Sequence, residues 1–399
     1  MLKTHLARLD PAGVTSLCII SVMGTVALSA LMLLPLMVGA YVDYLGFAED
    51  TAGWVSGINL AGIAFMTLIV SLKTRHWPLE RVAAYGLATM IIFDLLSLFY
   101  TNLYAFSVFR FLSGMGGGAV QAAIAAAIAR LAHSDRGFGI YIGFQFLLPA
   151  LAFFLLPGLL PDVGFTGLMQ ILIGLEAVLL LFSATLANYR ISDSANSGQE
   201  QIELRLMMKP AALFSIIALC IYGAANAAIY AYAERIGLAT GMSGQETGNA
   251  LSIANVLAVL GALLVVWLQD KYGHIKPLSA GIACQVIAML LLLYNPTVAG
   301  YWTGITIWSV AWAFSWPYFL SMQADIDSSG TVVVGGQFSN LVGNSLGPVM
   351  AAFLVSDGTY TAVIWLTGAL FILSLLPMYF VNRHLAPRTT LNSLDAQPG

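Results

Sequence analysis

Charged residues are scarce in this 399-residue chain, in which 9% of the residues are Asp, Glu, Lys or Arg and 59% are hydrophobic. Soluble globular domains carry about 25% charged residues, so the composition excludes that class. Cysteine is equally scarce: Cys18, Cys220 and Cys284 all lie inside apolar runs and have no metal-ligand spacing. An odd number of thiols in such surroundings indicates packing residues and not a disulfide framework.

Several kinds of functional motif are also missing. The apolar runs contain no cluster of carboxylates or histidines that would hold a metal ion, and the five histidines lie near loops and chain ends. No nucleophile and base occur together at a common depth, and no nucleotide-binding segment is present. We therefore expect no enzyme activity, no ATP-driven pumping, no cofactor, no metal and no nucleic-acid partner.

Long apolar runs dominate what remains, and many approach the ~20 residues that span a bilayer as a helix. The ten-residue alternation of a membrane barrel is absent, so helices must satisfy the backbone within lipid. The first run is too long for a cleaved signal peptide and is expected to stay attached. The sequence thus predicts an all-α integral membrane protein with twelve transmembrane helices near 16–42, 53–72, 80–100, 103–131, 138–160, 164–187, 211–233, 247–268, 277–294, 300–322, 330–355 and 360–382.

One long polar stretch divides the predicted helices into two sets of six. We expect an N-terminal bundle at 1–187, a cytoplasmic linker at 188–210, a C-terminal bundle at 211–383 and a cytoplasmic tail at 384–399. With the N-terminus in the cytoplasm, fourteen of the sixteen Lys and Arg fall on the cytoplasmic side. Such one-sided placement is the positive-inside pattern and supports the helix count. Arg235 is the exception on the outer side, and Arg110 falls in neither set of loops.

The two predicted bundles resemble copies of one another. Pro78 and Pro277 each begin a helix, and Pro149 and Pro348 each lie inside one, with an offset of 199 residues in both cases. A Ser-x-x-Asn pair also recurs, with Asn59 in one half and Asn255 in the other at an offset of 196. Parallel repeats of this kind are a transporter architecture.

The stretch RFLSGMGGGAVQ places an arginine in a strongly apolar run. On a helix, Arg110, Gly114, Gly117 and Gln121 share one face. An arginine in mid-bilayer costs about 2.5–3.5 kcal/mol, so that face should point into the bundle, with the glycines allowing a helix or a substrate to approach. A phosphate-binding glycine loop is disfavoured, because no strand precedes the glycines and no Lys-Ser/Thr follows them.

Three motifs together resemble the major facilitator superfamily of secondary transporters, and the resemblance covers essentially the whole chain. The stretch from Arg110 to Gly116 is similar to the family's Arg-x-x-x-Gly-x-Gly signature, and DKYGH at 270–274 is similar to its cytoplasmic Asp-Arg-x-Gly-Arg turn. Gly343-x-x-x-Gly347-Pro348 resembles the Gly-Pro motif of exporters, although drug antiporters carry that motif in helix 5. The loop after helix 2 lacks both the Asp and the Gly of the family turn.

The resemblance implies two pseudo-symmetric six-helix bundles that rock about a central cavity lined by helices 1, 4, 7 and 10. It also implies a set of residues that assist the conformational change: Gly114, Gly117, Asp270, Lys271, Gly273, Gly347 and Pro348.

Two carboxylates could partner Arg110. Asp94 lies ~9 Å and Arg110 ~10 Å from the outer ends of their helices, so their depths match, whereas Glu176 lies ~18 Å inside its helix. A carboxylate that moves between an apolar environment and the neighbourhood of an arginine can bind and release a proton. We therefore expect Asp94 or Glu176, influenced by Arg110, to couple transport to protons. The alternative is a purely structural Arg–Asp pair.

Other polar residues at helical spacing are candidate substrate contacts. Tyr222, Asn226 and Tyr230 recur every four residues on a face that leads to Glu234 at the outer membrane edge. Trp312 belongs to a tryptophan stripe that could equally pack against lipid or a helix. Amides in helix 11 could bind substrate or join helices. The full expected set is Arg110, Gln121, Tyr222, Asn226, Tyr230, Trp312, Gln337, Asn340 and Asn344.

These features predict a proton-coupled secondary transporter of a small organic solute that works by alternating access, with export by antiport as the expected direction. The alternatives are uptake of a neutral or mono-anionic solute by symport and, in another class, a non-transporting membrane sensor. The expected partners are the substrate, protons and the lipid bilayer. We expect a monomer in the cytoplasmic (inner) membrane with both termini in the cytoplasm.

Overall fold

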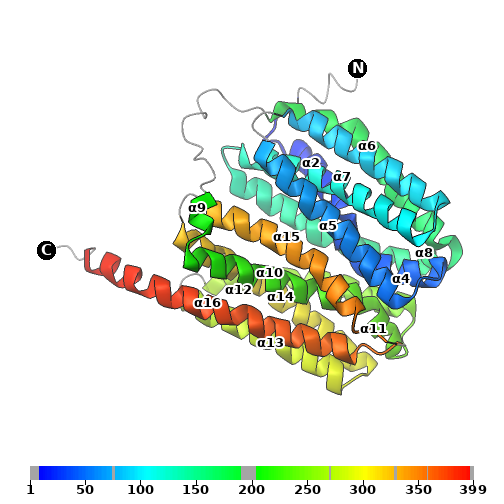
Figure 1. Ribbon diagram of the computed structural model, residues 1–399. Helices are drawn as coiled ribbons and strands as arrows, with labels where there is room; N and C mark the ends of the chain where they lie inside the picture. Colours follow the sequence, from blue (N-terminus) through cyan, green and yellow to red (C-terminus); the bar gives the residue numbers. More distant parts are fainter. Residues whose placement is uncertain are drawn as a thin grey trace.

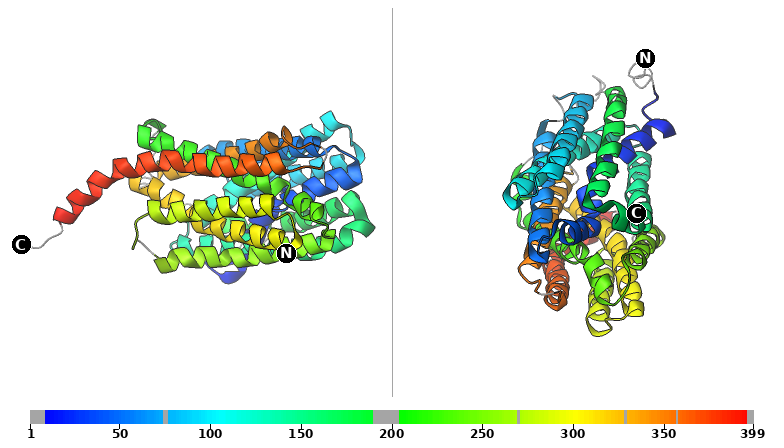
Figure 2. Two further views of the ribbon diagram at one scale, coloured as in Figure 1. Left: turned by 90° about the horizontal axis from the view of Figure 1, so that it is seen from below. Right: turned by 90° about the vertical axis from the view of Figure 1, so that its right-hand side faces the viewer.

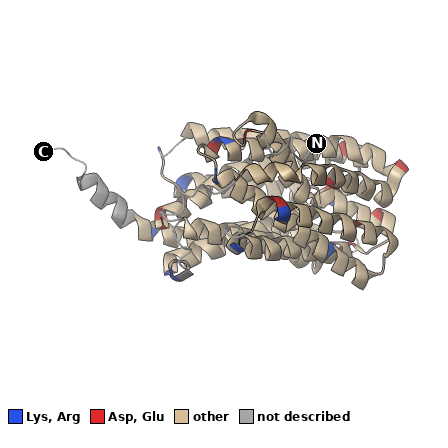
Figure 3. Ribbon diagram, turned by 90° about the horizontal axis from the view of Figure 1, so that it is seen from above, with Lys and Arg blue, Asp and Glu red and all other residues tan. Residues whose placement is uncertain are grey.

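The computed structural model describes residues 9–73, 77–189, 204–268, 271–327, 330–356 and 358–395. Eight helical segments in this part of the chain are long and apolar enough to cross a membrane by length and composition. Charged residues form a small minority of the ribbon (Figure 3). Large apolar side chains are exposed on the outside, among them Trp267, Leu263 and Leu376. A surface of this kind requires lipid around it.

The helices before the linker are α2 (Val14–Ala27), α3 (Ser29–Met32), α4 (Leu34–Leu45), α5 (Glu49–Lys73), α6 (Leu79–Phe99), α7 (Leu103–Ala129), α8 (Ser134–Phe182) and the 3-10 helix η1 (Ser183–Asn188). Those after it are α9 (Leu204–Met207), α10 (Pro210–Ala231), α11 (Ala233–Ala239), α12 (Gly244–Leu268), α13 (Ile275–Tyr294), α14 (Val298–Ile326), α15 (Thr331–Ala352) and α16 (Thr361–Asp395). The predicted all-helical membrane fold is confirmed.

We call residues 9–189 the N-half and residues 204–395 the C-half. Figure 1 shows the N-half helices on one side and the C-half helices on the other, and the end-on view in Figure 2 shows the same arrangement. The two halves meet along a seam formed by α5 against α15 and α8 against α12. One end of the bundle, the linker end, carries α9; the opposite end, the α11 end, carries α11 and the turn from α4 to α5 (Figure 1).

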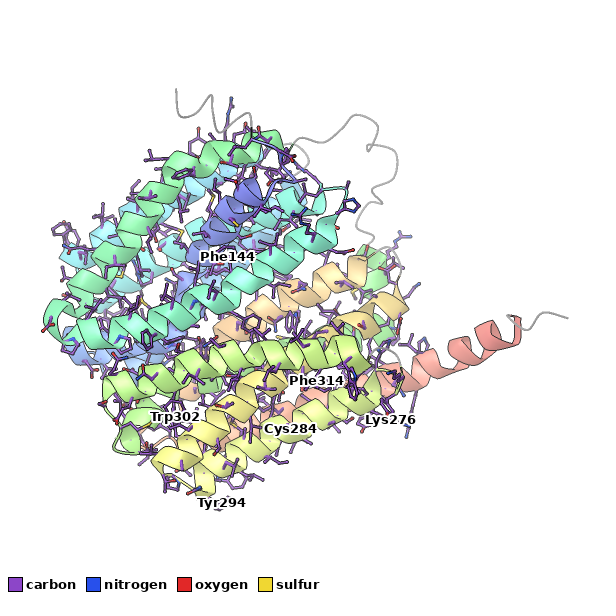
Figure 4. All side chains as sticks on the ribbon, turned by 180° about the vertical axis from the view of Figure 1, so that it is seen from behind. Phe144, Lys276, Cys284, Tyr294, Trp302 and Phe314 are labelled. Carbon is purple, nitrogen blue, oxygen red and sulfur yellow. The ribbon has the colours of Figure 1, made fainter. Side chains whose placement is uncertain are left out.

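Aromatic residues mark the α11 end of the bundle, and a lysine lies near the linker end. Figure 4 shows Tyr294 and Trp302 near the α11 end and Lys276 near the linker end, with α13 running between them. Tyr294 is 71% exposed. Tyrosine and tryptophan concentrate where the bilayer meets water. The α11 end therefore has the surface chemistry of a membrane interface.

The first predicted helix, expected as one continuous element at 16–42, is instead broken into α2, α3 and α4. Leu28 and Leu33 leave helical backbone geometry, with φ/ψ of −96/15° and −109/22°. Pro35 follows the second break, and a proline has no N–H to donate to the preceding turn. The single helix expected near 16–42 is therefore three consecutive helical segments, because length and apolar composition do not show where the backbone leaves helical geometry at Leu28 and Leu33.

The fifth and sixth predicted helices form the two arms of α8, which are joined at Gly164. Gly164 has φ 59° and ψ −164°, a geometry that a side chain would strain. The chain therefore turns there without a long loop. The second arm carries Glu176 into the interior of the N-half, where that residue is fully buried.

Candidate functional site

A buried ion pair lies in the interior of the N-half. Arg110 of α7 and Asp94 of α6 are 2% and 3% exposed, and Arg110 Nη2 lies 2.5 Å from Asp94 Oδ1. The same nitrogen donates to Ser97 Oγ at 2.9 Å and to the Phe93 carbonyl at 3.4 Å. Asp94 and Arg110, which the sequence places at similar depths in the membrane, are thus in direct contact.

Glu176 is the third member of this group, which we call the inner cluster (Asp94, Arg110 and Glu176). Its carboxyl lies beside that of Asp94 and within electrostatic range of Arg110. Neither of its oxygens has a hydrogen-bond partner among the described residues. One arginine thus faces two carboxyl groups, and a single proton shared between those groups makes the cluster neutral.

A small cavity adjoins the ion pair. It encloses about 10 Å³, which is the space of roughly one water molecule. Asp94, Arg110 and Asn59 line it, together with Ser29 of the broken first helix. Arg110 Nε and Asn59 Oδ1 have no hydrogen-bond partner within the described part of the chain. A water molecule in this cavity would find a donor and an acceptor at its edge.

The glycines of α7 serve close helix packing. A Cβ at Gly114 would collide with the Asn59 carbonyl of α5, and one at Gly117 with the Ala27 carbonyl of α2. Gly116 faces the Gly86 carbonyl of α6 in the same way. The backbones of three neighbouring helices therefore lie directly against the glycines of α7. Small residues permit such close helix packing in membrane proteins. The sequence left open whether a helix or a substrate approaches these glycines, and in the structure neighbouring helices occupy the space beside them.

Gln121, the last residue of the face that begins at Arg110, accepts a hydrogen bond from the hydroxyl of Tyr141 in α8. Gln121 is half-buried and Tyr141 is buried. The amide is therefore held in place by an aromatic side chain of a neighbouring helix.

A buried polar network occupies the C-half. Asn226 Oδ1 accepts from Trp308 Nε1 at 3.1 Å and from Gln285 Nε2 at 3.2 Å, and Asn226 Nδ2 donates to the Tyr222 carbonyl. The Tyr222 ring lies 4.7 Å from the Phe319 ring and is fully buried. Tyr222 and Asn226 thus lie inside the C-half. Gln285, which no sequence pattern singled out, belongs to this network.

Tyr230 and Trp312 lie where the halves meet. The Tyr230 hydroxyl donates to the Met32 carbonyl at 2.7 Å, at the second break of the first helix. Trp312 packs edge-on against Phe146 of α8, with ring centroids 5.8 Å apart. These aromatic side chains of the C-half therefore contact the N-half directly.

The amides of α15 mostly join helices. Asn340 Nδ2 donates to the Leu219 carbonyl of α10 at 3.4 Å, and Asn344 Nδ2 donates to Asn340 Oδ1 at 3.1 Å. Gln337 is exposed. A Cβ at Gly347, next to Pro348, would collide with the Ala224 carbonyl of α10. This face of α15 thus packs on α10.

The turn between α12 and α13 is only partly described, since Asp270 lies outside the described residues. Gly273 has φ 64°, in the left-handed region that favours glycine. Lys271 Nζ lies 5.6 Å from the centre of the Trp267 ring. Among the residues that the structure describes, no group of three or more His, Cys, Asp or Glu could hold a metal ion.

Comparisons with known proteins agree with one another. The sequence model of a family described as Major Facilitator Superfamily matches residues 17–334. The crystal structure of the nucleoside transporter NupG is similar, with a TM-score of 0.72 and 15% identity over 92% of this chain and 98% of that one. A bacterial homologue of the human drug peptide transporters PepT1 and PepT2 aligns with a TM-score of 0.72 and 14% identity, covering 98% of this chain and 99% of that one. A comparison with curated proteins finds no match.

Proposed function

The chain belongs to the major facilitator superfamily, and on that premise we propose that it is a proton-coupled secondary transporter of a small organic solute. Transport proceeds by rocking of the N-half (bundle 1–187) against the C-half (bundle 211–383) about the α5–α15 and α8–α12 seam. The linker end faces the cytoplasm of an inner membrane, in keeping with the one-sided distribution of Lys and Arg. The linker 188–210 and the tail 384–399 lie on that side.

The inner cluster carries this proposal. Asp94, Arg110 and Glu176 are buried together, with one positive and two potentially negative groups. Charges inside a membrane protein are expensive and mark proton relays and ion pathways. A proton that binds between Asp94 and Glu176 neutralises the cluster, and its release restores one net negative charge. Movement of the helices that changes water access to the cluster therefore links solute transport to proton flow.

The substrate site lies at the junction of the halves near mid-membrane. Tyr230 and Trp312 already contact the N-half there, and the half-buried amides Gln121 and Asn344 belong to α7 and α15. Arg110 is enclosed by Asp94 and its other acceptors, which favours a coupling role over direct substrate contact. Aromatic and amide groups suit a neutral or mono-anionic organic molecule.

Export by proton antiport is the proposed direction, because Gly343-x-x-x-Gly347-Pro348 resembles the exporter motif. In α15 these residues pack on α10, as the contact of Gly343 with the Cys220 carbonyl illustrates. Uptake by symport is the alternative. Solute flux in right-side-out and everted vesicles under an imposed pH gradient separates the two directions.

The test uses proteoliposomes that contain a pH-sensitive dye. A thermal-stabilisation screen of sugars, amino acids, nucleosides and aromatic drugs first selects a solute, and its addition should then move protons across the membrane. Glu176→Gln should abolish the solute-driven proton flux while leaving solute exchange across equal pH intact. Asp162→Asn, which neutralises an exposed carboxylate of α8, is the matched control and should behave as the parent protein. Full proton flux in both Glu176→Gln and Asp94→Asn would refute the coupling role.

A further inference from the structure

A second group of charged residues joins the two halves at the α11 end. Arg235 of α11 in the C-half donates to the Gly39 carbonyl of α4 at 2.9 Å and pairs with the Asp43 carboxylate of α4 in the N-half. Glu234 Oε2 lies 3.5 Å from Arg235 Nε. We call Asp43, Glu234 and Arg235 the outer cluster. Unlike the inner cluster, it spans the seam.

The burial of Glu234 depends on the opposite half. Glu234 is 8% exposed, and its Oε2 has no hydrogen-bond partner among the residues that the structure describes. A Cβ on Gly39 would collide with this carboxylate, so the Glu234 side chain rests directly on the α4 backbone. Any motion that separates α4 from α11 therefore exposes Glu234 to water.

Neighbouring contacts close the same end. The Tyr232 hydroxyl donates to the Glu49 carbonyl at 3.0 Å, and the Tyr360 hydroxyl donates to Glu49 Oε1 at 2.6 Å. Both tyrosines belong to the C-half and Glu49 begins α5 in the N-half. The outer cluster is thus part of a closed layer of polar contacts that must break when the α11 end opens.

The electrostatics of the closed layer are unbalanced, because Arg235 faces two carboxylates. Burial raises the pKa of Glu234 to about 7; Arg235 opposes this rise and Asp43 adds to it. Arg235 stays charged throughout. Other titratable groups face this cluster from the surrounding elements: Tyr44 from α4, Tyr301 from α14 and Tyr360 before α16. Glu246 of α12 is exposed, and its carboxylate accepts hydrogen bonds from Ser243.

We propose that Glu234 is a second proton-binding residue of the transport cycle, which takes up a proton when the gate at the α11 end closes and releases it when that gate opens. The proposal rests on the alternating access proposed above. The observations that carry it are the contact of Glu234 with α4 across the seam and the sharing of Arg235 with Asp43.

The direction of the pH effect follows from the closed structure. A hydrated glutamate titrates near its ordinary pKa of about 4.3, whereas Glu234 in the closed gate binds its proton more tightly. Proton binding therefore favours the closed gate as the pH falls through 7. Between about pH 4.5 and 7 the closed-to-open ratio should change by up to tenfold for each pH unit. Above pH 7 both states are ionised and the closed gate loses this advantage.

The experiment measures the gate directly and needs no substrate. Spin labels at Ala48→Cys in the N-half and Ala239→Cys in the C-half, both exposed positions near the α11 end, report the distance across the gate. Cys18, Cys220 and Cys284 are first replaced by alanine. Double electron–electron resonance in nanodiscs between pH 5 and 9 should show a long-distance population that grows as the pH rises towards 7 and levels off above it. Glu234→Gln should keep the short distance at every pH.

Two further variants separate the possible outcomes. In Asp43→Asn, Arg235 pairs with Glu234 only, so the pH at which the gate opens should move to a lower value. A merely structural role of Asp43 would not produce this change. Glu176→Gln should retain the gate's pH response even though it loses proton-coupled flux. The flux assay therefore tests the coupling role of the inner cluster, and the spin-label distances test Glu234 independently. An unchanged pH response in Glu234→Gln, a response that disappears only in Glu176→Gln, or no response in the parent would each overturn the inference.

Discussion

Replacement of Arg110 by glutamine tests the energetics of the inner cluster. The substitution removes a guanidinium whose Nη2 serves Asp94, Ser97 and the Phe93 carbonyl, and it leaves two buried carboxyl groups without a counter-charge. Breaking a buried ion pair from one side costs about 3–5 kcal/mol in soluble proteins. In the unfolded state within the membrane, polar groups also find hydrogen-bond partners, which reduces the difference. We expect Arg110→Gln to lower the free energy of unfolding by ~3 kcal/mol.

A double-mutant cycle with Asp94→Asn isolates the pair itself. The second substitution should cost ~2 kcal/mol less in the Arg110→Gln background than in the parent protein, because Asp94 has then already lost the guanidinium with which it pairs. Reversible unfolding in mixed detergent and SDS micelles supplies the free energies. Arg136→Gln, at an exposed position, is the matched control and should change stability by less than ~0.5 kcal/mol. An Arg110→Gln effect below ~1 kcal/mol, or additive single effects, would refute the reasoning.

Three further predictions concern packing and hydrogen bonds. Gly118→Ala should lower stability by ~1–3 kcal/mol in the same unfolding assay, because its Cβ meets a carbonyl of α5, whereas Gly139→Ala, which meets nothing within 4 Å, should not. Tyr230→Phe removes the hydroxyl that donates to Met32, so the long-distance population in the spin-label experiment should rise at constant pH. Asn226→Leu leaves an indole and an amide donor unpaired and should cost ~1–3 kcal/mol; a neutral result would mean that those donors find other acceptors.

The pairing of Asp94 with Arg110 could be predicted from the sequence for a definite physical reason. Their helices are joined by a short connection, since α6 ends at Phe99 and α7 begins at Leu103. Counting residues from that shared connection therefore places both side chains at one level. Glu176 belongs to a helix that begins at Gly164, whose level relative to α6 is set by packing alone. Its contact with Asp94 could not be found by counting along the chain.

The outer cluster illustrates the same limit. The sequence singled out Arg235 as the one basic residue on its side of the membrane, but its partner Asp43 lies 192 residues away in the other half. Residue counting gives the depth of a side chain and not the face it presents across the seam. The run at 16–42 is apolar and long enough for one span, and Pro35 is the residue within it that indicates the second break, because proline has no N–H to donate to the preceding turn.

The short helix α4 connects the two clusters physically. Tyr41, buried against the Phe106 ring at 5.3 Å, lies within electrostatic range of Arg110, and Asp43 two residues later pairs with Arg235. The breaks at Leu28 and Leu33 separate α4 from α2, so α4 can shift without moving the whole first helix. A displacement of α4 that opens the outer cluster necessarily moves Tyr41 relative to Arg110. In the proposed cycle, proton release at Glu234 and rearrangement around Asp94 and Glu176 are therefore linked through one rigid element, α4, which contacts the outer cluster at Gly39 and Asp43 on either side of Tyr41.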